Sequence, residues 1–289
     1  MSGGAPRLAL VTGASRGIGL AICHGLAAQG VQLLMLARDP RRLQQASAQI
    51  AERYPGAVCA TYAADLADSA ALPGLGRAMA AKWPRIDILI HNAGIIEMAR
   101  RENSAGLELT WATNVLAPFL LTRALLPALP AQASTRVVFM SSLVRRWGQL
   151  RRSDNQYVHG YTADAAYNQS KLALVLLAAA WARQQPGWLS LSMEPGMTDT
   201  DFGSQYRGLR ALIRRCYRPW MATPAQAADT AVWLATADAS ALAGGQHFIR
   251  RQPCHLRPEP ALEDWLWSTL CAQSTALLPP TAAGAPSFR

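Results

Sequence analysis

The stretch Leu8-Ala9-Leu10-Val11-Thr12-Gly13-Ala14-Ser15-Arg16-Gly17-Ile18-Gly19 decides the fold. Its four apolar residues predict a buried strand, and the run from Leu20 to Ala27 predicts a helix. A strand, a glycine turn and a helix in this order are the context of a dinucleotide-binding turn. Gly13 would permit the tight turn, Gly17 the close approach of a pyrophosphate, and Gly19 close packing of helix on strand. We also predict that three of the residues between these glycines contact the cofactor: Ser15, Arg16 and Ile18.

Length and composition indicate one large α/β domain, since 289 residues with 51% hydrophobic content can bury a substantial core and no Pro/Gly/Ser-rich linker divides the middle. The first seven residues are too short and polar for a signal peptide, and no apolar run approaches the ~20 residues of a membrane span. We therefore expect a soluble, cytoplasmic protein. The five cysteines are scattered without a C-x-x-C pair, so neither a disulfide framework nor a zinc site is predicted.

The net charge of +10 would allow an acidic partner such as nucleic acid, a membrane surface or an anionic substrate. No nucleic-acid recognition motif or aromatic-interleaved basic stripe accompanies it, so we expect no nucleic-acid partner. An excess of arginine over lysine also follows from base composition alone.

The strand expected at Val31 to Leu36 should end near the ribose of a bound adenosine. A site for NAD usually presents a carboxylate there, whereas this chain has Ala37 followed by Arg38. Arg38 and Arg16 could clamp a 2′-phosphate, which predicts NADP(H). Asp39 keeps NAD(H) open, because a shift of one residue in the strand end would bring its carboxylate to the ribose.

Two further strands lead into turns that could contact the cofactor. The run Val58 to Ala63 leads to Asp65 and Leu66, where the carboxylate could accept a hydrogen bond from an adenine amino group, although a plain turn aspartate explains the residue equally well. The run from Ile86 to Ile90 leads through His91 into a turn whose small residues would let backbone lie flat against a cofactor, namely Asn92, Ala93 and Gly94.

A long helix is expected from Glu108 to Leu126, and it carries Asn114. Asparagine is a poor helix former, so a local task such as holding a water or a carbonyl is plausible. The following strand, Arg136 to Met140, delivers Ser141 and Ser142 at its carboxyl end, where ligands bind in open parallel sheets.

Tyr167 is followed four residues later by Lys171, one of only two lysines among 28 basic residues. On a helix this spacing stacks the two side chains on one face. An ammonium beside a phenol favours phenolate, whose pKa is otherwise near ~10, and so prepares a tyrosine for proton transfer near neutral pH. Chance Tyr-x-x-x-Lys pairs are common, so the surrounding motifs carry the interpretation.

In this order the motifs resemble those of short-chain dehydrogenases/reductases: the glycine turn, Asp65, Asn92-Ala93-Gly94, Asn114, Ser142, Tyr167 with Lys171, and Pro195-Gly196 with Thr200. The resemblance runs from about Leu8 to Gly245. It implies a single doubly wound Rossmann-type parallel sheet with helices on both faces, formed by residues 1–276.

The resemblance also implies a role for each matching residue. Tyr167 would exchange a proton with the substrate oxygen, while Lys171 lowers the pKa of that tyrosine and holds the nicotinamide ribose. Ser142 would hydrogen-bond the substrate carbonyl or alcohol, and Asn114 would keep a water that links Lys171 to solvent. The nicotinamide side would be completed by Pro195, Gly196, Thr198 and Thr200.

Within the family the chain is most similar to the retinol-dehydrogenase-like branch. The 25-residue gap from Ser142 to Tyr167 resembles the loop inserted in that branch, as do Thr223 to Ala228, His247-Phe248 and a late helix from Leu262 to Trp267. His91 stands where the family more often has a second asparagine, and we interpret it as a satisfied polar contact and not as a catalytic acid.

The helix from Lys171 to Trp181 is apolar nearly all round and needs burial on both sides. In the resembling family this helix often packs against a second subunit, so a homodimer or homotetramer is expected. The alternative is a helix wholly buried within one subunit.

A lid over the substrate is expected at about 201–222, where apolar residues recur at helical spacing and most arginines lie on the other side. Arg145, Arg146, Arg151 and Arg152 lie in the other segment that the resemblance makes substrate-facing. The lid would cover a hydrophobic substrate or contact an anionic carrier or a membrane surface, while a solvated arginine face explains it equally well. Residues 277–289, rich in Pro and Ala, are expected to be disordered.

Three functions fit these motifs. The first is hydride transfer between NADP(H) and a carbonyl or alcohol. The second uses the same fold and cofactor for lyase or isomerase chemistry. The third is a catalytically silent cofactor-binding regulator, for which the Tyr167–Lys171 pair would have no use.

Overall fold

The computed structural model describes residues 6–131, 134–196, 221–257 and 259–277. Its centre is a single sheet with the strand order β3-β2-β1-β4-β5-β6-β7-β8, in which all neighbours are parallel except the antiparallel β7–β8 pair. The strands are β1 (Leu8–Thr12), β2 (Gln32–Ala37), β3 (Val58–Ala63), β4 (Ile88–His91), β5 (Arg136–Met140), β6 (Leu189–Glu194), β7 (His247–Ile249) and β8 (Gln252–Cys254).

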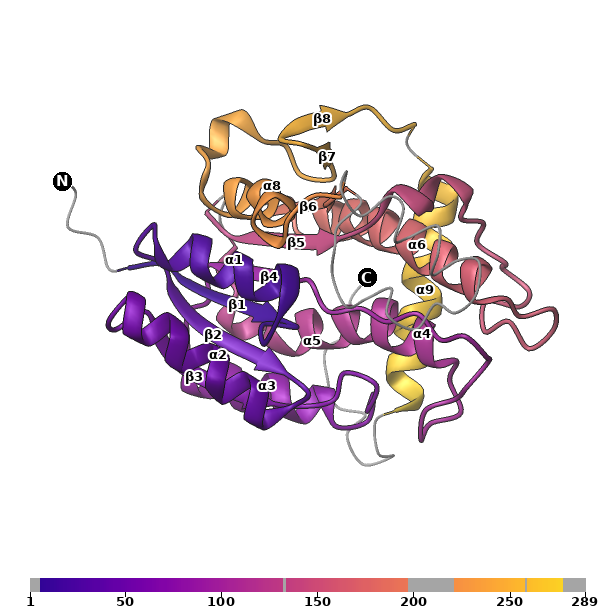
Figure 1. The fold of residues 1–289 in the computed structure, drawn as a ribbon. Coiled ribbons are helices and arrows are strands. Elements are labelled where there is room, and N and C mark those ends of the chain that lie inside the picture. Colours follow the sequence, from indigo (N-terminus) through magenta and orange to yellow (C-terminus); the bar gives the residue numbers. More distant parts are fainter. Residues whose placement is uncertain (1–5, 132–133, 197–220, 258, 278–289) are drawn as a thin grey trace.

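Helices cover both faces of the sheet, as expected for a doubly wound fold (Figure 1). One face packs against α1 (Gly17–Ala27), α2 (Pro40–Arg53) and α8 (Pro224–Thr236). The other packs against α3 (Leu72–Lys82), α5 (Ala117–Leu125) and α6 (Ala163–Gln184). The strand order reverses at β1, so the carboxyl ends of β1 and β4 flank the place where open α/β sheets bind ligands.

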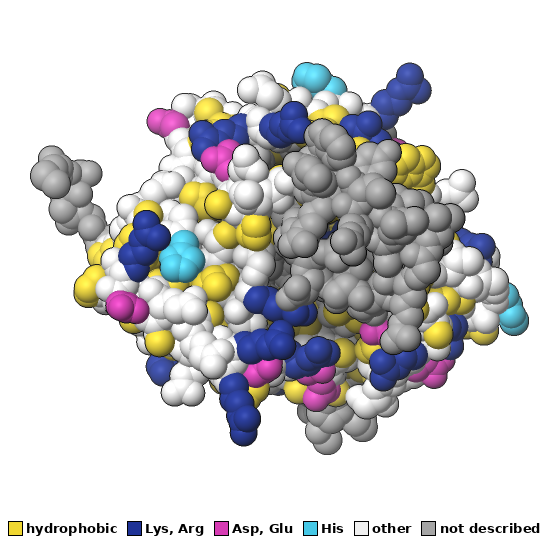
Figure 2. Space-filling model, viewed as in Figure 1, with side chains coloured by type: hydrophobic (Ala, Val, Ile, Leu, Met, Phe, Trp, Pro, Cys, Tyr) yellow, Lys and Arg dark blue, Asp and Glu magenta, His cyan; other side chains and the backbone are white. Residues whose placement is uncertain are grey.

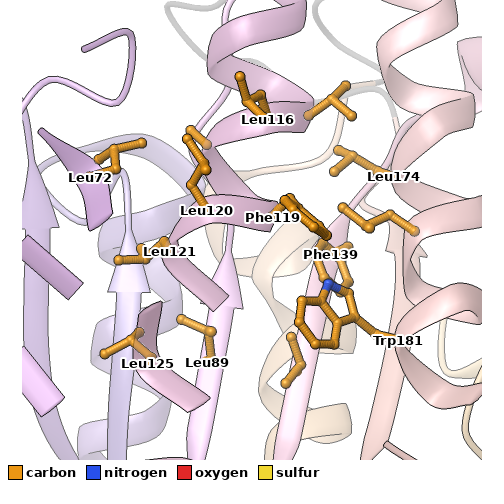
Figure 3. Packing of buried hydrophobic residues seen from close by; sticks show 14 of the residues in the cluster. Leu72, Leu89, Leu116, Phe119, Leu120, Leu121, Leu125, Phe139, Leu174 and Trp181 are labelled. Carbon is orange, nitrogen blue, oxygen red and sulfur yellow. The ribbon is translucent and has the colours of Figure 1, made fainter. Parts of the chain in front are cut away.

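Successive residues of a strand point to opposite faces of the sheet and so enter two different hydrophobic cores. In β1, Leu8 and Leu10 join the cluster beneath α5 and α6, whereas Ala9 and Val11 join the cluster beneath α1 and α8. Burial on both faces explains why the strands are continuous apolar runs. In the first cluster, Phe119, Phe139, Leu174 and Trp181 lie close together between the sheet and the helices (Figure 3).

The helix expected at Glu108 to Leu126 is interrupted in its middle. It begins as α4 (Leu109–Trp111), widens into the π-helical turn η1 (Ala112–Leu116), continues as α5 and ends in the 3-10 turn η2 (Leu126–Ala128). From Leu109 to Ala128 it is long and apolar enough to cross a membrane, contrary to the sequence expectation, but 78% of its apolar 18-residue window is buried inside the protein. It packs as a core helix.

A C-terminal helix, α9 (Pro260–Ala276), covers the outer side of α6 (Figure 1). Leu266 and Leu270 are fully buried, and the Trp267 ring meets Trp181 edge-on at a centroid distance of 4.9 Å. Arg183 of α6 pairs with Glu263 of α9 at 3.1 Å. The apolar helix is therefore buried within one subunit, the alternative that the sequence left open, and its composition no longer argues for a dimer.

Candidate active site

The glycine turn between β1 and α1 has the geometry of a phosphate cradle. Gly13 and Gly17 have φ angles of +68° and +55°, a region that disfavours other residues. A Cβ on Gly19 would lie 2.2 Å from the Gly13 carbonyl oxygen, so helix and turn touch through backbone alone. Ser15 is half-buried and Arg16 is exposed at the helix start, where Ile18 packs inward from the first turn. The N-terminus of α1 thus presents its amide groups to an anion.

The turn after β4 is fastened to this cradle. The Thr12 hydroxyl accepts hydrogen bonds from the amides of Asn92 and Ala93, each at 3.1 Å. The Asn92 Nδ2 donates to the Thr12 carbonyl at 2.9 Å. The glycine turn and the turn after β4, which lie 80 residues apart in the sequence, are therefore hydrogen-bonded to each other. The role of Thr12 was not predicted from the sequence, where the available signal was a hydroxyl at the end of a buried strand.

Two neighbouring side chains after β2, those of Arg38 and Asp39, could contact the ribose of a bound cofactor, and the structure gives them different surroundings. Arg38 is exposed directly after the last strand residue, Ala37. The Asp39 carboxylate caps α2, because its Oδ1 accepts from the amides of Arg41 at 3.0 Å and Arg42 at 3.1 Å. The strand ends one residue later than expected, but the carboxylate is engaged in its own helix.

Asp65 and Leu66 lie just beyond β3. The Asp65 Oδ1 accepts a hydrogen bond from the Ala67 amide at 3.0 Å, an Asx turn, while its side chain is exposed. Leu66 is buried at 7% exposure and belongs to the core under α5. Both residues stand at the carboxyl edge of the sheet, where the sequence motifs placed them.

Tyr167 and Lys171 stack on one face of α6. The Lys171 Nζ lies 5.4 Å from the centroid of the Tyr167 ring and donates to the Met140 carbonyl oxygen at 2.9 Å. The ammonium is buried, no carboxylate in the described part of the chain pairs with it, and this burial lowers the pKa of Lys171 to about 8. A Cβ on Gly94 would lie 3.3 Å from the Nζ, so the glycine leaves room for this side chain.

Lys171 should leave a signature in the pH dependence of stability. Because its folded pKa of about 8 is below the usual ~10.4, the unfolded chain binds more protons between these values, and stability rises with pH there. The burial cost of the ammonium is complete below about pH 8 and is relieved as the pH climbs toward ~10.4. Urea unfolding measured from pH 7 to 11 should therefore show that the free energy of unfolding of the wild type rises with pH relative to that of Lys171→Met. A constant difference between the two proteins would contradict a buried ammonium.

The two serines after β5 have different surroundings. Ser141 is buried, and its hydroxyl donates to the Lys171 carbonyl at 2.7 Å. Ser142 is half-buried with an extended φ of −159° and begins the 3-10 helix η3 (Leu143–Trp147). The Ser141 hydroxyl is thus committed to α6, which favours Ser142 as the serine that faces a substrate.

Asn114 lies in the π-helical turn and joins three segments of the site. Its Oδ1 accepts from the Ile95 amide at 2.8 Å, and its Nδ2 donates to the Ile95 carbonyl at 2.9 Å and to the Ser170 hydroxyl at 3.0 Å. The Ser170 hydroxyl in turn donates to the Tyr167 carbonyl. Asn114 therefore holds the turn after β4 against the helix that carries Tyr167 and Lys171, which explains the asparagine inside a helix.

His91 is a buried neutral group. Its Nε2 lies 2.8 Å from the Thr122 hydroxyl, and its ring stacks on Phe139 at a centroid distance of 5.0 Å. Burial lowers the pKa of His91 to about 3. These contacts confirm the interpretation of His91 as a satisfied polar residue.

The loop between Ser142 and Tyr167 is pinned to α6. The Gln169 side chain accepts from the Arg151 amide and donates to the Asn155 carbonyl, both at 2.9 Å. The Arg151 guanidinium lies 4.3 Å from the centroid of the Tyr157 ring. Arg151 therefore stabilises the loop while its side chain stays 44% exposed. Arg145 is buried in the ion pair described below and does not face an anionic substrate as the sequence suggested.

Pro195 and Gly196 follow β6 at the carboxyl edge, with Gly196 at a φ of +78°. The expected cofactor contacts Thr198 and Thr200 lie outside the described residues, as do most of the predicted lid and all but the first residue of the predicted tail.

The fold and these motifs agree with what known proteins show. A family model described as short chain dehydrogenase matches residues 7–208. The chain belongs to the short-chain dehydrogenase family. It is an oxidoreductase that acts on CH–OH or C=O groups.

Two relatives and one solved structure define the likeness more closely. The chain is 36% identical to "Putative daunorubicin C-13 ketoreductase DnrU" of Streptomyces sp. (strain C5), over 86% of this chain and 85% of that protein. It is 28% identical to human retinol dehydrogenase 14, over 83% and 76% of the two chains. A "putative short chain dehydrogenase" from Escherichia coli CFT073, solved with NADPH, superposes with a TM-score of 0.66 at 27% identity and covers 85% of this chain and 97% of that chain.

The residues of this short-chain dehydrogenase fit a nicotinamide dinucleotide. The cradle formed by Gly13, Gly17 and Gly19 leaves backbone amides open to a pyrophosphate, and Arg16 and Arg38 are exposed at the same edge of the sheet. Tyr167 and Lys171 stand farther along that edge, beyond β4 and β5.

Proposed function

We propose that this short-chain dehydrogenase uses NADP(H) to interconvert a carbonyl and an alcohol on a hydrophobic substrate. The observation that carries the proposal is the Lys171 ammonium, which is buried, stacked on the Tyr167 ring and without a carboxylate partner among the residues that the structure describes. Such a pair suits proton transfer to or from an oxygen near neutral pH. A silent cofactor-binding protein would have no use for a buried cation of this kind.

Each residue of the site would have a separate role in the reaction. Tyr167 would pass its phenolic proton to the substrate oxygen during reduction and take it back during oxidation. Ser142 would hold that oxygen by a hydrogen bond, and Lys171 would favour the phenolate that remains on Tyr167. When bound, the nicotinamide supplies or accepts the hydride. Asn114 fixes the backbone on which these side chains stand and would retain the water that returns a proton to Lys171.

Hydrophobic carbonyl compounds are the substrates that we propose. The bacterial relative is named for ketoreduction at C-13 of daunorubicin and the human relative for retinol, and these two names guide the choice of test substrates. An NADPH-coupled screen should include a polycyclic ketone, retinal and a short neutral ketone. Turnover of the first two above the third would support the proposal. Cofactor-dependent elimination or isomerisation without change in NADPH absorbance would favour the lyase or isomerase alternative.

The preference for NADP(H) over NAD(H) rests on Arg38 and Asp39. The carboxylate that could have bonded a ribose 2′-hydroxyl caps α2 instead, and an exposed arginine stands at the strand end. The NADPH-bound Escherichia coli structure supports this choice.

Replacing Arg38 by Ala should weaken NADPH binding by about 10- to 100-fold, because a charge-assisted hydrogen bond contributes about 1.5–3 kcal/mol. The affinity for NADH should change little. Calorimetric titration of both cofactors measures the two constants, with Arg53→Ala, at the far end of α2, as the matched control. A wild type that prefers NADH would contradict the 2′-phosphate site.

The partner would be a small molecule and, as a prediction, a second copy of the chain in a homodimer or homotetramer. The outer side of α6 does not support that oligomer, because α9 of the same chain covers it. Figure 2 shows Lys and Arg side chains spread over several parts of one face, together with exposed apolar atoms. The anionic-carrier or membrane contact through the lid concerns residues outside the described ranges.

A further inference from the structure

Three charged or titratable side chains that the proposed mechanism does not use meet in the interior beside the site. They are Arg145 of η3, Glu194 at the end of β6 and His247 of β7, with exposures of 7%, 4% and 2%. The Arg145 Nε lies 3.4 Å from the Glu194 Oε2 and donates to the His247 Nε2 at 2.9 Å. Figure 1 shows β6 and β7 side by side near this edge of the sheet.

The contacts favour one tautomer of His247, whose Nε2 also lies 3.7 Å from the Glu194 Oε2. Since the His247 Nε2 accepts the Arg145 proton, the imidazole carries its own proton on Nδ1 and donates it to the Ser192 hydroxyl at 2.9 Å. Burial lowers the pKa of His247, which agrees with a neutral ring. The Arg146 guanidinium lies 3.9 Å from the Glu194 Oε1 and is half exposed. The cluster therefore comprises one buried carboxylate, one buried guanidinium and a neutral histidine that holds the guanidinium in place.

Both charged residues lie beside residues of the active site. The Arg145 amide donates to the Ser142 carbonyl at 3.1 Å, so the arginine belongs to the turn that Ser142 begins. Glu194 directly precedes Pro195 and Gly196. The ion pair thus joins the segment that carries the substrate-facing serine to the turn on the nicotinamide side, two segments that approach from different strands.

We propose that the Arg145–Glu194–His247 cluster is a positioning device that fixes Ser142 relative to the Pro195–Gly196 turn. This inference rests on the proposed function. A buried ion pair commonly contributes little net stability, because desolvation offsets the attraction, and an apolar pair of similar volume is often as stable. The pair is then better explained by the single geometry that it imposes than by the stability that it adds.

The test replaces both charges together. The double variant Arg145→Met/Glu194→Leu removes the pair without leaving an unpaired buried charge, so its thermal midpoint should stay within a few degrees of the wild-type value. Its kcat for carbonyl reduction should fall about 100-fold, the effect of a misplacement of about 1 Å, with a smaller change in the KM for NADPH. Arg183→Met/Glu263→Leu, which removes the pair between α6 and α9, is the matched control and should keep the wild-type kcat.

A second variant keeps the proposal testable if the double variant does not fold. Glu194→Gln keeps the size of the side chain and removes its charge, and it should also lower kcat in the folded protein. The nicotinamide fluorescence of bound NADPH should change in both variants. A folded variant of either kind with wild-type kcat and wild-type fluorescence would overturn the positioning role. A wild type that binds NADPH but reduces no carbonyl contradicts the proposed function alone, since the fluorescence comparison still decides the role of the cluster.

Discussion

Tyr167→Phe is expected to lower kcat by about 10²- to 10⁴-fold, because the variant keeps the ring and loses only the hydroxyl that transfers the proton. The Lys171 contact with the ring, at 5.4 Å from its centroid, should survive and so should NADPH binding. Steady-state kinetics with NADPH and the best ketone of the screen measure the loss, and calorimetric titration checks the cofactor.

Tyr62→Phe is the matched control for this experiment. The Tyr62 hydroxyl accepts a hydrogen bond from the Trp83 indole at 2.7 Å, and the residue lies on β3, away from Tyr167. The same loss of one hydroxyl should leave kcat unchanged. If Tyr167→Phe turned over substrate as fast as this control, the phenol would not be the proton donor.

Trp181→Ala should lower the free energy of unfolding by about 3–5 kcal/mol, the usual cost of truncating a large buried aromatic side chain. Trp181 is 2% exposed, stacks on Trp188 at a centroid distance of 5.7 Å and meets Trp267 edge-on. It also lies against Phe119 (Figure 3). Removing it would leave a cavity where the sheet, α5, α6 and α9 join.

Urea unfolding followed by circular dichroism measures this loss. Trp147→Ala is the matched control, since the Trp147 side chain is 66% exposed and its truncation should change stability by no more than about 0.5 kcal/mol. Equal losses in the two variants would contradict the central place of Trp181 in the core.

The fold could be predicted from the sequence, and the candidate site residues could be named, because local signals mark both. The glycine turn follows an apolar strand, and Tyr167 and Lys171 have the spacing of one helical face. Asn114 could be singled out because asparagine is out of place in a helix, although the π-helical turn that holds it gives no separate signal in a single sequence. The end of β2 could be predicted to within one residue, which was too coarse to decide between Arg38 and Asp39.

Contacts between distant segments could not be predicted from the sequence. Nothing near Arg145 indicates that Glu194, 49 residues later, balances its charge, so the arginine was taken for a substrate-facing group. Helix α3 carries Pro73, Gly74 and Gly76, which weaken a local helix signal. The structure explains one of them, because a Cβ on Gly76 would lie 2.4 Å from the Cβ of Ala124 on α5. The packing of α9 on α6 was also missed, because it too is a contact between distant segments.

The position of α9 also constrains the order of folding. Its partners on α5 and α6 leave the ribosome well before Leu266 and Leu270, because the whole segment from β6 to β8 is synthesised in between. At elongation rates of about 5–20 residues per second, the outer surface of Phe119 and Trp181 stays uncovered for seconds. The nascent chain therefore presents an aromatic surface to chaperones and to other nascent chains until α9 docks, and premature termination before residue 260 would make that exposure permanent.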